Sequence, residues 1–204
     1  MPPGGQPRFL VVEGLDGAGT TTQSGLVADA LRARGVAVCL TAEPSDGPLG
    51  RVARAYVRGQ IALGPAATAL AFVADRADHL ERVIRPALAA GQWVVCDRYV
   101  LSTLAYQGAE GVDRLWVLQA SGALDCPDLT VFLDVPARQR GERMASRPTA
   151  DIYEAGALQD ALATSYGASI DLLAARGHRI VIVDGTGDPQ AVCGAILAEL
   201  DALG

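Results

Sequence analysis

The chain has 204 residues, of which half are hydrophobic and a fifth are charged, and its formal net charge is −6. This length and composition fit one folded domain, with room for at most a small appendage, and exclude a disordered chain. The acidic balance argues against a nucleic-acid-binding surface, and no apolar run is long enough to cross a membrane.

Residues 1–5 (Met-Pro-Pro-Gly-Gly) lack the charged and apolar segments of a signal peptide, so we expect a cytoplasmic protein. The four cysteines form no CxxC pair and have no histidine at metal-ligand spacing; they are Cys39, Cys96, Cys126 and Cys193. This spacing favours reduced thiols over a metal site or disulfides. His79 and His178 have no partner in the sequence pattern, and we expect no functional role for either.

Predicted strands and helices alternate along the chain. Apolar runs predict strands at 8–13, 36–40, 93–96, 129–133 and 180–183. Apolar residues at helical spacing predict helices at 21–34, 49–60, 65–90, 100–106, 112–120, 137–145, 155–176 and 189–203. Pro86 is expected to kink the longest helix. The alternation predicts right-handed βαβ units and an α/β fold, with one mostly parallel sheet covered by helices on both faces.

The first strand leads into a glycine-rich segment, Glu13-Gly14-Leu15-Asp16-Gly17-Ala18-Gly19-Thr20-Thr21-Thr22, and a helix follows it. Strand, glycine loop and helix are the context of a phosphate-binding P-loop with the pattern G-x-x-x-x-G-K-[ST]. We expect ATP to bind along this loop, at Gly14, Gly17, Ala18, Gly19, Thr20, Thr21 and Thr22. The Thr21 hydroxyl has the position that holds Mg²⁺ in such loops.

Thr20 stands where the P-loop pattern has its lysine. The chain contains no lysine and no asparagine, so all 17 of its basic residues are arginine. A cation on the transferred phosphoryl group raises the rate of transfer by about 10³–10⁵. A threonine hydroxyl group carries no positive charge and cannot supply this effect. Arg140, Arg143 and Arg147 share one helix face and are the candidates to replace it. They lie beside a polar stretch that we interpret as a lid over residues 143–154; a solvated basic helix face is the alternative.

Further motifs follow in a fixed order along the chain: Glu43-Pro44, Asp75-Arg76, Asp97-Arg98-Tyr99, Ser102-Thr103, Ala105-Tyr106-Gln107-Gly108, and Arg147…Asp151…Glu154. Together with the glycine loop they resemble the thymidylate kinase family. The resemblance implies a single domain over residues 1–204 with the architecture of P-loop nucleoside monophosphate kinases, a five-stranded parallel sheet surrounded by helices. It also implies transfer of the γ-phosphoryl group of ATP to dTMP, with Mg²⁺, by a homodimer.

The same resemblance assigns roles around the acceptor phosphate and the sugar. Arg98 would grip the acceptor phosphate, and Asp97 would help Thr21 to place Mg²⁺. Asp16 would bond the 3′-hydroxyl group, and Tyr106 would disfavour a 2′-hydroxyl group.

The resemblance also assigns the residues that recognise the base. Phe72 would stack on thymine, while Arg76 and Thr103 would bond its edge. Glu43 and Gln107 belong to the matching motifs and are expected to line the substrate site. Arg143 and Arg147 match lid arginines of the bacterial enzymes and are expected to be catalytic with Arg98 and Asp97.

The chain departs from the family pattern at three places. Thr20 replaces the lysine, Ala42 stands where bacterial members often have arginine, and Ile152 stands where their lid often has arginine. An acid, Asp46, is added nearby. Two alternatives therefore stay open: a nucleotide-binding protein with weak or no catalysis, and a kinase for another deoxynucleoside monophosphate.

Overall fold

The computed structural model describes residues 8–122, 125–145 and 156–203. Five parallel strands form one sheet in the order β2-β3-β1-β4-β5. The strands are β1 (Phe9–Gly14), β2 (Val38–Ala42), β3 (Trp93–Asp97), β4 (Leu129–Asp134) and β5 (Ile180–Asp184). The predicted α/β class and five-stranded parallel sheet are confirmed.

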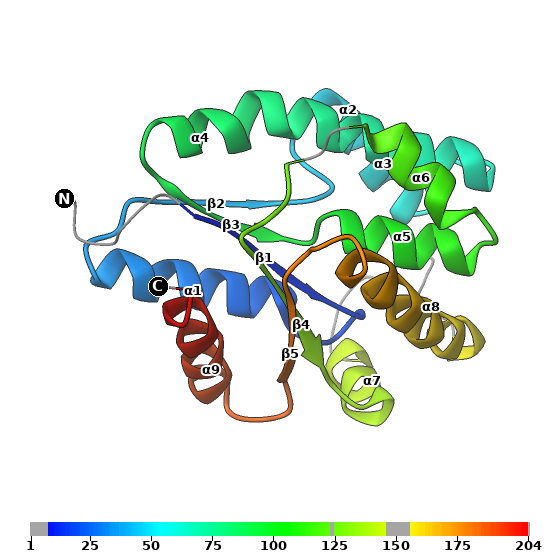
Figure 1. Cartoon of the computed structure of the whole chain (residues 1–204). Helices are drawn as coiled ribbons and strands as arrows, with labels where there is room; N and C mark the ends of the chain where they lie inside the picture. The colour runs from blue at the N-terminus through cyan, green and yellow to red at the C-terminus, as the bar shows by residue number, and fades with distance from the viewer. Residues whose placement is uncertain (1–7, 123–124, 146–155, 204) are drawn as a thin grey trace.

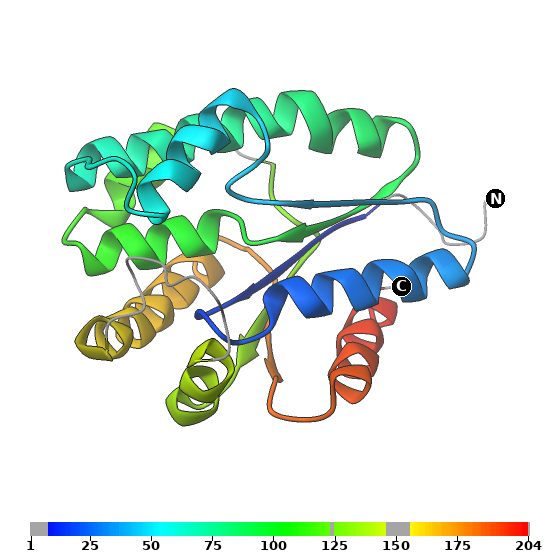
Figure 2. The same cartoon turned by 180° about the vertical axis from the view of Figure 1, so that it is seen from behind.

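Helices cover both faces of the sheet (Figures 1 and 2). One face carries α1 (Thr20–Ala33) and α9 (Pro189–Asp201). The other carries α2 (Pro48–Val57), α3 (Pro65–His79), α4 (Arg85–Ala89), α5 (Val100–Ala109), α6 (Arg114–Ser121) and α8 (Gly156–Ala174). The short helix α7 (Ala137–Ala145) follows β4. Within the described ranges, no helix is long and apolar enough to span a membrane.

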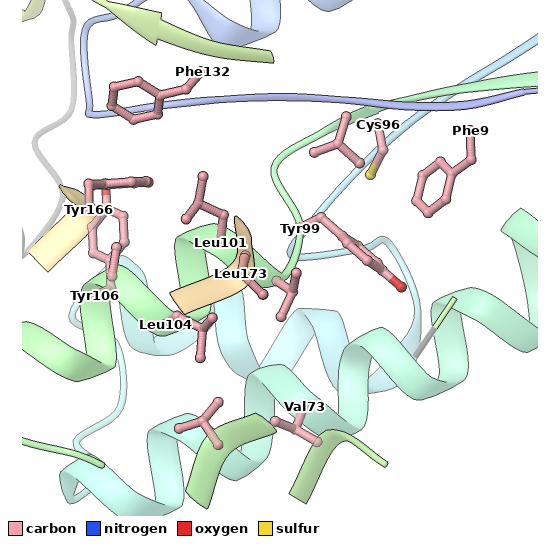
Figure 3. Close-up of a cluster of buried hydrophobic side chains, with 14 of the residues drawn as sticks. Phe9, Val73, Cys96, Tyr99, Leu101, Leu104, Tyr106, Phe132, Tyr166 and Leu173 are labelled. Carbon is pink, nitrogen blue, oxygen red and sulfur yellow. The ribbon is translucent and has the colours of Figure 1, made fainter. Parts of the chain in front are cut away.

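The central strand β1 sends alternate side chains into two separate cores. Phe9 and Val11 belong to the core under α3, α5, α6 and α8, part of which Figure 3 shows. Leu10 and Val12 belong to the core under α1 and α9. The edge strands are less covered than predicted, because the helices lie mainly over the central strands: Leu40 on β2 is 43% exposed and Ile182 on β5 is 63% exposed.

The predicted helix over residues 65–90 changes its winding in the middle. A π-helical turn, η1 (Leu80–Ile84), separates α3 from α4, which contains Pro86. Proline has no N–H group, and its ring clashes with the carbonyl group four residues earlier in a regular α-helix. The wider turn leaves room for the ring, so the predicted kink takes the form of a local expansion.

Candidate active site

The glycine loop follows β1 directly and ends at the first turn of α1. Gly17 and Gly19 have φ angles of 83° and 97°, which residues with a Cβ atom disfavour. A Cβ atom on Gly17 would also lie 2.6 Å from the carbonyl oxygen of Arg140. Gly19 is the N-cap residue and has no side chain to cap α1. The backbone N–H groups at this helix end therefore suit an anion, as the sequence predicts.

Thr21 and Asp97 meet beside this loop, because the sheet register pairs Val12 of β1 with Asp97 at the end of β3. Thr21 Oγ1 donates to Asp97 Oδ2 at 2.5 Å, and Oδ1 of the same carboxylate is buried without a hydrogen-bond partner among the described residues. Hydroxyl and carboxylate oxygens are the ligands that Mg²⁺ prefers, so this pair fits the ion. No cluster of three or more His, Cys, Asp or Glu side chains forms in the described ranges.

Arg143 brings a positive charge to the glycine loop. Its Nη1 atom donates to the carbonyl oxygens of Gly17 and Ala18, at 3.3 and 3.1 Å. The same atom lies 3.8 Å from the position that a Cβ atom on Gly19 would take. The guanidinium of Arg143 therefore lies against the loop residues that precede Thr20, the residue at the lysine position.

The other two arginines of the predicted basic face do not share this position. Arg140 is 4% exposed, and its Nε and Nη1 atoms donate to the Val135 carbonyl oxygen (3.1 Å) and to Gln159 Oε1 (2.5 Å). Its Nη1 atom also donates to the carbonyl oxygen of Asp16 at 3.5 Å. Arg140 is therefore buried between α7, α8 and the glycine loop rather than facing solvent. Arg147 lies outside the described residues, as does the predicted lid beyond residue 145.

Arg98 follows β3 and is held on both sides of its guanidinium. Its Nη2 atom contacts Asp16 Oδ1 at 2.7 Å, and both side chains are mostly buried. Its Nη1 atom faces the hydroxyl groups of Ser102 (3.1 Å), Tyr106 (3.4 Å) and Tyr166 (3.1 Å). The guanidinium carbon also lies 5.5 Å from the centre of the Tyr106 ring, within range of a cation–π contact. The sequence predicted three of these residues at the site, but neither Ser102 nor Tyr166 as partners of Arg98.

Glu13 holds the turn after β3 from inside the protein. Its Oε1 atom accepts the backbone N–H groups of Tyr99 (2.8 Å) and Ser102 (3.1 Å), and its Oε2 atom accepts the Ser102 hydroxyl at 2.6 Å. The side chain is fully buried, and this burial raises the pKa of Glu13 to about 7, although the charge of Arg98 and the hydrogen bonds act in the opposite direction. An acid at the end of an apolar strand was the only sequence signal for this role.

We expect the Glu13→Gln variant to change how stability depends on pH. In wild type the raised pKa means that the folded state binds a proton more tightly than the unfolded state, so stability falls as pH rises from about 4.5 to about 7. Glutamine removes this titration while keeping a similar shape. The free energy of unfolding of the variant should therefore gain about 3 kcal/mol relative to wild type between pH 4.5 and pH 8. Urea unfolding of both proteins at the two pH values measures this. A difference in unfolding free energy between variant and wild type that is the same at both pH values would contradict the prediction.

Arg76 lines the same cleft as Arg98 and is 1% exposed. Its Nη2 atom contacts Glu43 Oε2 at 2.7 Å and Thr103 Oγ1 at 2.6 Å, and its guanidinium carbon lies 4.9 Å from the centre of the Tyr99 ring. Its Nε and Nη1 atoms are buried without a hydrogen-bond partner among the described residues. Buried donors of this kind are costly unless a ligand or water satisfies them.

His79 has partners that the sequence did not reveal, so the expectation of no role for it was incomplete. Its Nδ1 atom lies 3.2 Å from Glu43 Oε1, and its Nε2 atom lies 2.7 Å from Thr41 Oγ1. The ring is 1% exposed. His79 therefore fixes the carboxylate that in turn holds Arg76. His178 lies elsewhere, with its Nδ1 atom 3.3 Å from Cys126 Sγ.

One cleft of about 400 Å³ is lined by the glycine loop, by Arg98 and by Arg76. Fourteen of the predicted site residues line it: Asp16, Gly17, Gly19, Thr20, Thr21, Thr22, Glu43, Phe72, Arg76, Asp97, Arg98, Thr103, Tyr106 and Gln107. Gly14, Ala18 and Arg143 support the loop without lining the cleft. The structure therefore brings the loop and the residues predicted to bind the acceptor phosphate and the base together in one space.

Arg54 on α2 also lines the cleft, and sequence reasoning missed it. Its Nη2 atom donates to the Pro44 carbonyl oxygen at 2.6 Å and contacts Asp46 Oδ1 at 3.1 Å. Its side chain is 36% exposed. A single arginine on an amphipathic helix gives no signal by itself, because most such residues lie on solvated faces.

Comparison with known proteins identifies relatives along most of the chain. The family model described as thymidylate kinase matches residues 12–196. The thymidylate kinase of Bordetella petrii is 40% identical over 203 residues, which cover 96% of each chain. That of Thermomicrobium roseum is 49% identical over 133 residues, or 63% of each chain. The probable thymidylate kinase of Pyrococcus horikoshii is 41% identical over 146 residues, or 69% of this chain and 71% of its own.

Proposed function

The chain belongs to the thymidylate kinase family, and we propose that its cleft transfers the γ-phosphoryl group of ATP to dTMP with an arginine in place of the P-loop lysine. The products are dTDP and ADP. The observation that carries the proposal is that one cleft joins the glycine loop to Arg98 and Arg76. A donor phosphate on the loop and an acceptor phosphate on Arg98 can therefore approach each other in line.

The acceptor side needs charge and position rather than a general base. A phosphate monoester is already ionised at pH 7, so its oxygen can attack without losing a proton to the protein. The planar fork of Arg98 suits two phosphate oxygens, and Arg54 is a further arginine that lines the cleft. Asp16, which contacts Arg98, is proposed to take the 3′-hydroxyl group of the sugar.

The donor side supplies backbone N–H groups from the start of α1 and the guanidinium of Arg143. Arg143 lies on the loop carbonyl groups of Gly17 and Ala18 and on the carbonyl group of Gly185, and its guanidinium is proposed to exchange some of these contacts for a γ-phosphate oxygen when ATP binds. Thr21 and Asp97 would hold Mg²⁺, which supplies charge neutralisation on the donor phosphates. ATP and Mg²⁺ are thus the cofactors that we propose.

The base side favours thymine. The Nε and Nη1 atoms of Arg76, for which the described part of the chain offers no hydrogen-bond partner, are donors and match the carbonyl oxygen at position 4 of thymine. Cytosine has an amino group, also a donor, at that position. Phe72 and Gln107 also line the cleft and are proposed to complete the base site, with Tyr106 beside the sugar.

Release of ADP from ATP and Mg²⁺ with dTMP, dCMP or dGMP as acceptor tests this proposal. We expect kcat/KM for dTMP to exceed that for dCMP by about 10²-fold, since the wrong base would leave the Arg76 donors unsatisfied. If dCMP or dGMP were turned over in preference to dTMP, the protein would be a kinase for that other deoxynucleoside monophosphate. Calorimetric binding of ATP and dTMP without turnover would instead indicate a binding protein without useful catalysis.

We also propose that the protein is a homodimer that pairs through α2, α3 and α6. These helices are neighbours (Figure 1) and expose apolar side chains that a second copy would cover: Val52, Leu70, Leu115 and Trp116, each between 38% and 46% exposed. Exposed apolar side chains that group on one surface are typical of an interface. Membership of the family and the net charge of −6 further support a cytoplasmic enzyme that acts on small molecules rather than on nucleic acid.

The Leu70→Glu variant should dissociate this dimer, because it places a charge at the centre of an apolar interface. Sedimentation velocity is expected to show twice the chain mass for wild type and the chain mass for the variant. Ile182→Glu is the matched control, since Ile182 is an exposed apolar residue on the distant edge strand β5. An equal shift in both variants, or a monomeric wild type, would contradict the proposed interface.

A further inference from the structure

Tyr166 belongs to α8, a helix to which neither the sequence pattern nor the reaction assigns a role. The residue is 1% exposed. Its ring packs against Phe132 and Tyr106, with ring centres 5.2 and 6.0 Å away (Figure 3). An aromatic side chain in this place could be explained as core packing alone. Its hydroxyl group, however, lies among polar atoms of the site.

The hydroxyl group of Tyr166 joins the phosphate loop to the acceptor arginine. It donates to the carbonyl oxygen of Gly14, the first glycine of the loop, at 3.2 Å. It accepts from Arg98 Nη1 at 3.1 Å and lies 3.0 Å from Ser102 Oγ. Burial raises the pKa of this hydroxyl, so it keeps its proton at neutral pH and remains a donor. One oxygen atom is therefore shared between the donor side and the acceptor side.

Arg98 depends on such contacts more than an ordinary residue does. Among the described residues it is the one non-glycine with a positive φ angle, 70°, a conformation that persists only where the surroundings hold it. Glu13 holds the following backbone through the N–H groups of Tyr99 and Ser102. The direction of the guanidinium is then set by Asp16 on Nη2 and by the hydroxyl groups on Nη1.

We infer that Tyr166 is a positioning residue for phosphoryl transfer, which fixes the guanidinium of Arg98 relative to the glycine loop through its hydroxyl group. The inference rests on the proposed function. In-line transfer requires the two phosphates at a set separation and angle, and a displacement of about 1 Å can cost about 10²-fold in rate. Because the hydroxyl contacts both the loop carbonyl and the arginine, its loss lets the acceptor move relative to the donor.

The Tyr166→Phe variant tests this role, since it removes the hydroxyl and keeps the ring. We expect kcat with dTMP to fall about tenfold or more, while KM for ATP stays within about twofold. Tyr56→Phe is the matched control: its hydroxyl donates to Glu110 Oε1 at 3.0 Å, and Tyr56 does not line the cleft. Tyr56→Phe should lose about as much thermal stability as Tyr166→Phe, but its kcat should equal that of wild type. In an Arg98→Lys background, Tyr166→Phe should have little further effect, because the two residues act together.

A second measurement does not depend on turnover. Arginine side-chain ¹⁵N NMR of the ligand-free protein, assigned with Arg98→Lys, should show slowed Arg98 Nη signals in wild type and faster exchange in Tyr166→Phe. Identical Arg98 signals in the two proteins would overturn the inference, as would a kcat equal to that of the Tyr56→Phe control. If wild type did not turn over dTMP, the proposed function would fail while the NMR result still decided whether Tyr166 fixes Arg98.

Discussion

Replacing Arg143 by alanine is expected to lower kcat for dTMP phosphorylation by about 10³-fold or more, because a cation on the transferred phosphoryl group is worth about 10³–10⁵ in rate. Arg143 is the arginine whose guanidinium contacts the loop directly before Thr20, at the carbonyl groups of Gly17 and Ala18. Steady-state ADP release measures the effect. Calorimetric binding of ADP separates a lost catalytic charge, which leaves ADP affinity nearly unchanged, from a disordered loop, which abolishes it.

Arg138→Ala is the control for this variant, since Arg138 lies on the same helix but is 81% exposed and paired with Glu142. Its kcat should stay within about twofold of wild type, as expected for an exposed ion pair. Arg143→Lys should recover part of the lost rate, because the ammonium group restores the charge but not the fork. A rate within tenfold of wild type for Arg143→Ala would exclude this arginine as the substitute for the lysine.

Replacing Arg98 by methionine should lower kcat/KM for dTMP by about 10³-fold, with KM for ATP nearly unchanged. Two charge-assisted hydrogen bonds to a phosphate contribute about 1.5–3 kcal/mol each, which together account for a loss of this size. Methionine keeps the apolar stem of the side chain. Initial rates over a matrix of ATP and dTMP concentrations separate the two substrates.

The variant also leaves Asp16 without its partner, which could disturb the loop by itself. The double variant Arg98→Met/Asp16→Asn removes that charge and should be no more active towards dTMP. Arg32→Met is the control for loss of an exposed arginine that pairs with an aspartate, Asp29, and should match wild type. A defect in Arg98→Met that appeared equally in KM for ATP would contradict an acceptor-side role.

The parts of the fold that depend on local pattern could be predicted. Apolar runs located all five strands within about two residues, since continuous burial leaves a plain signal. The glycine loop could be predicted because its glycines, strand and helix are contiguous. The π-helical turn could not be predicted, because the widening of the helix before Pro86 depends on how the helix packs in three dimensions.

The contacts that complete the site could not be predicted, because they join residues far apart in the chain. Glu13 and Ser102 are 89 positions apart, and Arg98 and Tyr166 are 68 apart. A buried tyrosine on an amphipathic helix has the same sequence pattern whether its hydroxyl meets a backbone carbonyl or an arginine. The resemblance to a family supplied roles for Arg98 and Arg76, but the pattern itself gave no sign of His79 or Arg54.

This kinase is proposed to work without a P-loop lysine because an arginine supplies the charge. The most direct measurement compares kcat for ATP and dTMP in wild type and in Thr20→Lys. We expect wild type to turn over dTMP, and Thr20→Lys to change kcat by less than about tenfold, since the charge is already present. An inactive wild type whose turnover is restored by Thr20→Lys would contradict the claim and indicate a nucleotide-binding protein that has lost its catalysis.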